Sequence, residues 1–180
     1  MISSALEEIR VGTAAAFRTA LGLGAYVVGA TTGLTYARFL GLRAAAERAL
    51  SLGNLDDADR LAGELLNLAA AYREDWNHGN AVHHGNLIRG RAALKRGDVQ
   101  QASDHLRAAG KTEGSPQLKS FGPNMILARE LLRVGEQAAV LEYLEDCKVF
   151  WQGALATSLD KWVAEIEQGR EPDFGPNLVY

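Results

Sequence analysis

The chain has 180 residues, of which 47% are hydrophobic and 23% are charged, a balance typical of a folded domain and not of a disordered segment. A net charge of -3 argues against a nucleic-acid-binding protein, because such proteins usually carry a strongly basic surface. The single cysteine, Cys147, excludes an intrachain disulfide and favours a reducing compartment. All four prolines lie in the last third of the sequence, and no stretch shows the alternation of a strand, so we predict an all-α protein.

The first long apolar segment is residues 19–37, TALGLGAYVVGATTGLTYA, which contains no charged residue. It is long enough to span a bilayer, and Gly29 and Gly33 form a GxxxG spacing that lets membrane helices pack closely. We therefore predict that residues 1–37 form an apolar N-terminal helix that anchors the protein and packs against other membrane helices. A helix buried in a soluble fold is the alternative, because the segment is also rich in glycine, threonine and tyrosine.

The arginines that flank this segment bear on its orientation. Arg38, Arg43 and Arg48 follow it, whereas Arg10 and Arg18 precede it. The positive-inside rule then places the C-terminal domain on the cytoplasmic side. The sequence predicts a single-pass membrane protein with a cytoplasmic C-terminal domain, and a soluble cytoplasmic protein remains the alternative.

Three places within residues 38–168 share one pattern, in which a helical run is followed by a glycine and then by a polar residue. The glycines are Gly53, Gly97 and Gly135. Glycine suits the left-handed conformation that ends one helix, and a polar or acidic residue suits the start of the next helix. We predict three helical hairpins, each with one of these glycines in its turn.

The middle hairpin, GRAALKRGDVQQASDHL, has further features of a repeat. Gly90 lies seven residues before the turn glycine, and Ala102 and Leu106 have the spacing A-x-x-x-L; Ala46 and Ala128 match Gly90 in the other two hairpins. In these features the chain resembles tetratricopeptide repeat (TPR) proteins, whose unit is two antiparallel helices. The turn glycines are 44 and 38 residues apart, whereas the family repeats every 34, so the resemblance implies a TPR-like array with irregular connections.

The end of the chain reads as a capping helix and a tail. Ser158 is a suitable N-cap, and Gly169 ends the helix. One apolar face covers the end of the array, and residues 169–180 form an apolar tail that we expect to pack on the helices. That face consists of Leu159, Trp162, Val163 and Ile166.

Charge is unevenly distributed between the helices of each hairpin. The first helices are mostly basic and the second helices mostly acidic, and the helix dipole explains only part of this, since several of the basic residues are not terminal. First helices line the concave surface of TPR-like arrays, so the resemblance implies a basic groove for an acidic segment of a protein partner. The candidate groove residues are Arg43, His84, Arg91, Lys95, Arg129 and Arg133.

Three of the four histidines lie in NHGNAVHHGN, residues 77–86. The adjacent His83 and His84 point about 100° apart on a helix and cannot bind one ion together, and no second ligand cluster accompanies them. We predict helix surface here, with no metal and no cofactor. A small helical enzyme would require a closed pocket that gathers His78, His84 and Asp75.

The sequence as a whole predicts a non-catalytic interaction or assembly subunit of a larger complex. We expect protein partners and no nucleic acid. A soluble TPR-like adaptor is the nearest alternative.

Overall fold

The computed structural model describes residues 33–153 and 156–179, and every regular element there is helical, which confirms the all-α class for this part of the chain. The chain divides into two compact units, Met1–Arg38 and Phe39–Tyr180. In the first unit, residues 33–38 are helical; Gly33 is among them, whereas Gly29 lies outside the described residues. None of the helices in the described residues is both long and apolar enough to cross a bilayer.

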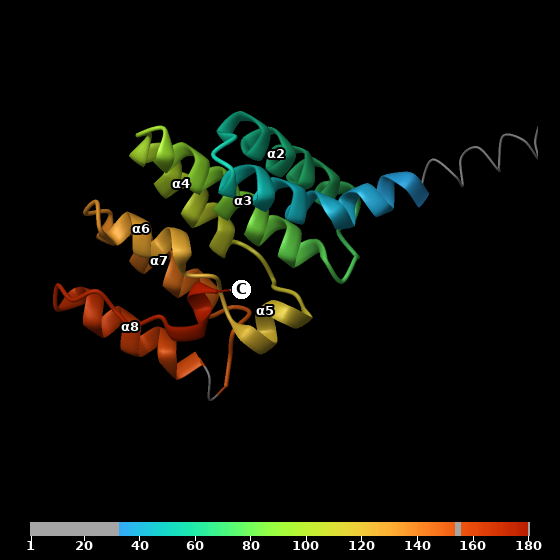
Figure 1. Cartoon of the computed structure of the whole chain (residues 1–180). Coiled ribbons are helices and arrows are strands. Elements are labelled where there is room, and N and C mark those ends of the chain that lie inside the picture. The colour runs from blue at the N-terminus through green and yellow to red at the C-terminus, as the bar shows by residue number, and fades with distance from the viewer. Residues whose placement is uncertain (1–32, 154–155, 180) are drawn as a thin grey trace, which may run out of the picture. The chain divides into compact units, whose positions relative to one another are not determined.

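The second unit is a succession of helices, shown in Figure 1. Contacts join α2 to α3, α3 to α4, α4 to α7 and α7 to α8, so neighbours in this series pack on one another. The elements are residues 39–51, α2 (Leu55–Ala71), α3 (His78–Lys95), α4 (Val99–Gly110), α5 (Pro116–Phe121), α6 (Ile126–Leu132), α7 (Gln137–Cys147), α8 (Thr157–Glu167) and the short 3-10 helix η2 (Gly175–Leu178).

The three predicted turn glycines each separate two helices and have the expected left-handed conformation. The φ angles are +79° at Gly53, +86° at Gly97 and +93° at Gly135. After the second of these turns, the Asp98 side chain accepts a hydrogen bond of 2.9 Å from the Gln101 backbone N–H and so caps α4. Local sequence signals therefore fix where each hairpin turns.

Helix α3 is packed on two sides, because its glycines let other helices approach. A Cβ atom on Gly85 would touch the Leu66 side chain of α2. A Cβ atom on Gly90 would touch the Leu127 side chain of α6 and approach the Ala102 carbonyl of α4. Small residues on α3 thus set the spacing of the helices around it.

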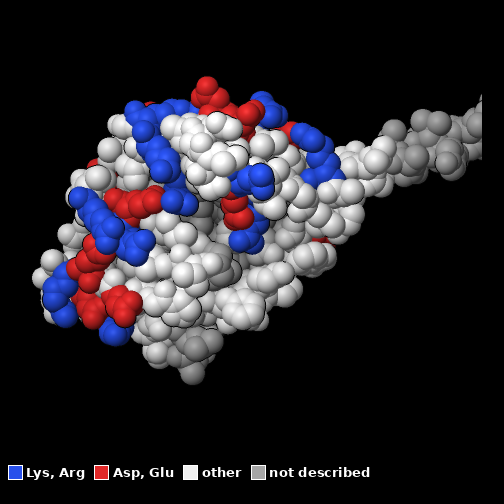
Figure 2. All heavy atoms as spheres, viewed as in Figure 1, with Lys and Arg blue, Asp and Glu red and all other residues white. Residues whose placement is uncertain are grey.

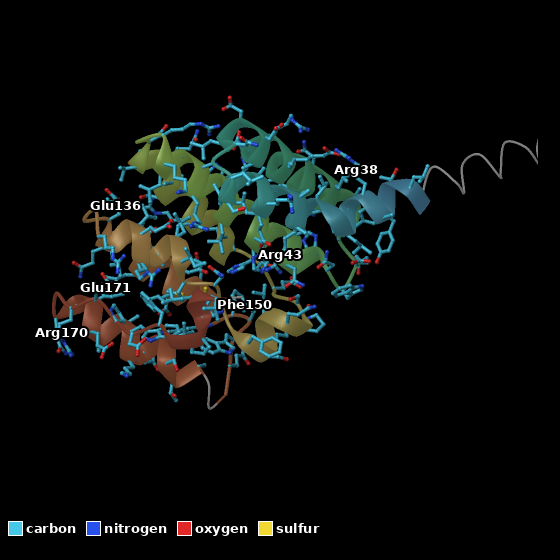
Figure 3. The ribbon with its side chains drawn as sticks, viewed as in Figure 1. Arg38, Arg43, Glu136, Phe150, Arg170 and Glu171 are labelled. Carbon is cyan, nitrogen blue, oxygen red and sulfur yellow. The ribbon has the colours of Figure 1, made fainter. Side chains whose placement is uncertain are left out.

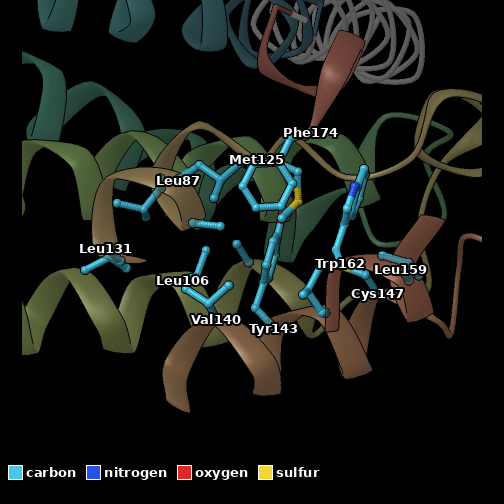
Figure 4. Close-up of a cluster of buried hydrophobic side chains, with 14 of the residues drawn as sticks. Leu87, Leu106, Met125, Leu131, Val140, Tyr143, Cys147, Leu159, Trp162 and Phe174 are labelled. Carbon is cyan, nitrogen blue, oxygen red and sulfur yellow. The ribbon is translucent and has the colours of Figure 1, made fainter. Parts of the chain in front are cut away.

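Two clusters of buried apolar side chains form the core of this unit. The smaller cluster joins residues 39–51, α2 and one side of α3, and includes Ala46 and Ile88. The larger one joins the other side of α3 to α4, α6, α7, α8 and the tail, with Tyr143 near its centre (Figure 4). The three alanines of the repeat pattern, Ala46, Ala102 and Ala128, are all fully buried.

Helix α8 packs on α7, and Leu159, Trp162 and Ile166 of its apolar face are buried. The prediction for its first turn was wrong, because Ala156 holds the N-cap position and Ser158 lies inside the helix. The tail contacts α8 and the core. The Trp162 Nε1–H donates to the Asp173 carbonyl at 3.1 Å, and Phe174 is only 1% exposed.

Candidate functional site

A cavity of about 530 Å³ lies against the first helix of each hairpin. Its walls come from residues 39–51, from α3, from the start of α6 and from the tail, and none of the described residues that line it belongs to α2, α4 or α7. We call this cavity the groove. Its polar walls include Arg43, Glu47, His84, Arg91, Lys95 and Asn124. Its apolar walls are Leu50, Leu87, Ile88, Ile126, Leu178 and Val179.

Four of the six predicted groove residues therefore line one cavity, whereas Arg129 and Arg133 do not. The Arg133 guanidinium binds the Glu171 carboxylate, with Nη2 and Oε1 2.7 Å apart. That hydrogen bond raises the pKa of Arg133 and lowers the pKa of Glu171. Figure 3 shows Glu171 at the edge of the array, well away from Arg43.

Most cations of the groove are already paired within the chain. Arg91 forms a two-pronged ion pair with Glu130 of α6, with Nη2–Oε1 and Nε–Oε2 distances of 2.9 and 3.0 Å. Arg43 is 2.8 Å from Glu47 on the same helix. Lys95, at the end of α3, is exposed and belongs to none of the ion pairs among the described residues. Figure 2 accordingly shows acidic side chains between the basic ones on this face.

Ion pairs between neighbouring helices explain part of the charge difference between the first and second helices. Arg89 of α3 is 2.8 Å from Asp59 of α2, and Arg96 at the end of α3 is 2.7 Å from Asp56. The basic residues of α3 therefore hold the acidic helix beside it. The groove keeps a smaller positive charge than the sequence predicts, and Lys95 is its unpaired cation in the described part of the chain.

His83 does not lie on the surface, so the prediction of helix surface was wrong for it. Its side chain is fully buried, with Nδ1 3.0 Å from the Ala109 carbonyl, while Nε2 accepts the Asn124 backbone N–H at 3.2 Å. This arrangement requires a neutral ring with the proton on Nδ1. Desolvation by burial lowers the pKa of His83 from 6.5 to about 4.

The loop before α6 is held at three points, and this places one wall of the groove. His83 binds the Asn124 N–H, the Tyr143 hydroxyl donates to the Asn124 carbonyl at 2.8 Å, and the Met125 N–H donates to the Asn177 carbonyl at 2.8 Å. Sequence reasoning missed this role of the histidine. One feature of the sequence does indicate burial of this histidine: residues 76–88 contain no Asp, Glu, Lys or Arg.

No known protein family, curated protein or solved structure matches this chain. The residues of the groove therefore carry the functional inference. They combine one exposed, unpaired lysine with six apolar side chains, a combination that suits an anionic ligand with an apolar part.

The histidines that an enzyme would need are not gathered in the groove. His84 lines the groove and is 3% exposed; burial, followed by the charges of His83 and Arg43, holds its pKa well below 6.5. His78 instead begins α3 with Nδ1 3.0 Å from the Ala69 carbonyl, and Asp75 accepts the Asn77 N–H. Neither His78 nor Asp75 lines the groove. Within the described ranges, no three histidine, cysteine or acidic side chains are placed to hold a metal ion.

Proposed function

We propose that the chain is a non-catalytic interaction subunit built as a TPR-like array, and that its groove binds an acidic segment of a protein partner. The observation that carries the proposal is a cavity lined by the first helices of all three hairpins, with the unpaired Lys95 at one end. The burial of Ala46, Gly90 and Ala128, which hold the same position in the three hairpins, supports the repeat interpretation. An ammonium group without a partner favours a carboxylate ligand.

The dimensions of the groove suit an extended peptide. Along α3, His84 and Lys95 are eleven residues apart, which corresponds to about 16 Å at 1.5 Å per residue. An extended chain rises about 3.3 Å per residue, so roughly five residues cover this length. The volume also falls within the range of about 300–1,000 Å³ that small-ligand sites occupy.

Fluorescence anisotropy with a labelled peptide of alternating glutamate and serine tests the groove. We expect binding that weakens steeply with salt, because exposed charges are screened beyond roughly 8 Å at physiological ionic strength. Lys95→Met should weaken binding several-fold. Lys161→Met is the matched control, because Lys161 is exposed on α8 and does not line the groove. Absence of binding, or equal loss in both variants, would contradict the proposal.

The proposal includes the anchor, which rests on the sequence of residues 19–37. Washing membranes from cells that express the full chain with alkaline carbonate tests it. The protein should stay in the membrane pellet, and a bulky residue at Gly29 or Gly33 should reduce association with other membrane helices. Release of intact protein into the wash would instead support a soluble adaptor of the same architecture.

A further inference from the structure

The tail of the second unit is fixed beside the groove by a buried asparagine. Asn177 is 5% exposed, and its Nδ2 amide donates to the Phe121 carbonyl at 3.0 Å and to the Pro123 carbonyl at 2.8 Å. Its own carbonyl accepts the Met125 N–H at 2.8 Å. Three hydrogen bonds therefore join one tail residue to the end of α5 and the loop before α6, which is enough to hold the following residues in place.

The two residues after this asparagine are apolar and line the groove. Leu178 is partly buried against the larger core cluster, while Val179 is 82% exposed. A tail that filled the groove as its occupant would have this valine covered. Its exposure indicates that the tail forms a wall of the groove and leaves the space beside it open.

The tail wall and Lys95 lie toward different ends of the groove. The tail wall adjoins Asn124, whose N–H binds His83 in the first half of α3, whereas Lys95 is the last residue of that helix. His83 and Lys95 are twelve residues apart, or about 18 Å along the helix. An extended chain covers this length in about five or six residues.

We propose that the tail residues Leu178 and Val179 build an apolar subsite, and that the groove selects partner segments with an apolar residue five or six positions from an acidic one. Residues five or six positions apart in an extended chain are about 17–20 Å apart, which matches the separation of the two ends. This inference rests on the proposed function, and it names the residue pattern of the partner.

Selection from a displayed library of random nine-residue peptides tests the pattern with the intact chain. Wild-type protein should enrich peptides with Glu or Asp and with Leu, Ile, Val or Phe five or six positions away. Leu178→Ser with Val179→Ser should abolish the apolar enrichment and weaken binding of a selected peptide about 10-fold, while the acidic enrichment persists. Val149→Ser is the matched control, because Val149 is 61% exposed and does not line the groove.

Val179→Ser alone serves as the second variant, since an exposed side chain contributes little to folding and its replacement should leave the unfolding temperature unchanged. It should reduce the apolar enrichment in part. Apolar enrichment that survives both tail variants, or acidic enrichment without any apolar preference, would overturn the subsite but leave the proposed function standing. Absence of any acidic enrichment in wild-type protein would overturn the proposed function and the subsite with it.

Discussion

The buried His83 predicts that acid destabilises the second unit. The pKa of His83 in the folded state is about 4, against 6.5 for the solvent-exposed side chain of the unfolded state. Between these values the unfolded chain binds a proton that the folded chain does not, so the free energy of unfolding falls as the pH falls from about 6.5 to 4. Because each pH unit in this range is worth about 1.4 kcal/mol, the total loss in the free energy of unfolding is about 3 kcal/mol.

Urea unfolding followed by circular dichroism at pH 7 and pH 5 measures the effect. Over this interval the linkage relation gives His83 a loss of about 2 kcal/mol. His84 and His105 also have lowered pKa values, so the informative quantity is the difference between wild-type protein and His83→Asn. Asparagine retains a donor for the Ala109 carbonyl but does not titrate, so the variant should lose about 2 kcal/mol less over the interval. Equal losses in both proteins would refute the assignment of a neutral, buried ring.

Three further predictions concern the packing of the second unit. Gly79→Ala should lower the free energy of unfolding in urea by about 2 kcal/mol or more, because the added Cβ would collide with the backbone of the loop at Gly114. Gly63→Ala, which has open space around it, should raise the free energy of unfolding by about 0.5–1 kcal/mol. Effects of equal sign would contradict this account. Asn177→Ala should lower the free energy of unfolding by about 1–3 kcal/mol, because two backbone carbonyls lose their hydrogen-bond donor. It should also speed proteolysis of the tail, followed by mass spectrometry. An unchanged cleavage rate would show that other contacts hold the tail. A double-mutant cycle on Arg91 and Glu130 should give a coupling free energy of about 0.5–1.5 kcal/mol, since both side chains are less than a third exposed. Additive effects of the two single mutations would show that the ion pair contributes nothing to stability.

The hairpins were predictable because their signals are local. Gly53, Gly97 and Gly135 are each needed for a left-handed turn, and this requirement does not depend on distant residues. The sequence also predicts small residues at Ala102 and Gly90, because two closely packed helices leave no room for a larger side chain. Periodicity and turn chemistry therefore predict much of the second unit.

The histidine and the ion pairs depend on contacts between residues far apart in the sequence. His83 accepts an N–H from a loop 41 residues away, and Arg91 binds a carboxylate 39 residues away. Composition identifies such residues as polar but does not say what they bind. The contribution of the tail to the groove likewise depends on Asn177, whose partners lie more than 50 residues earlier.

The most direct test of the groove is a map of amide chemical-shift changes in the second unit on addition of the glutamate and serine peptide. We predict the largest changes in residues 39–51, on the groove side of α3, at Asn124 and Ile126, and in the tail, with Lys95 among the residues most affected. Lys95→Met should reduce all of these changes together. Changes centred on the second helices α2, α4 and α7, or no changes at peptide concentrations that saturate other basic surfaces, would contradict the account.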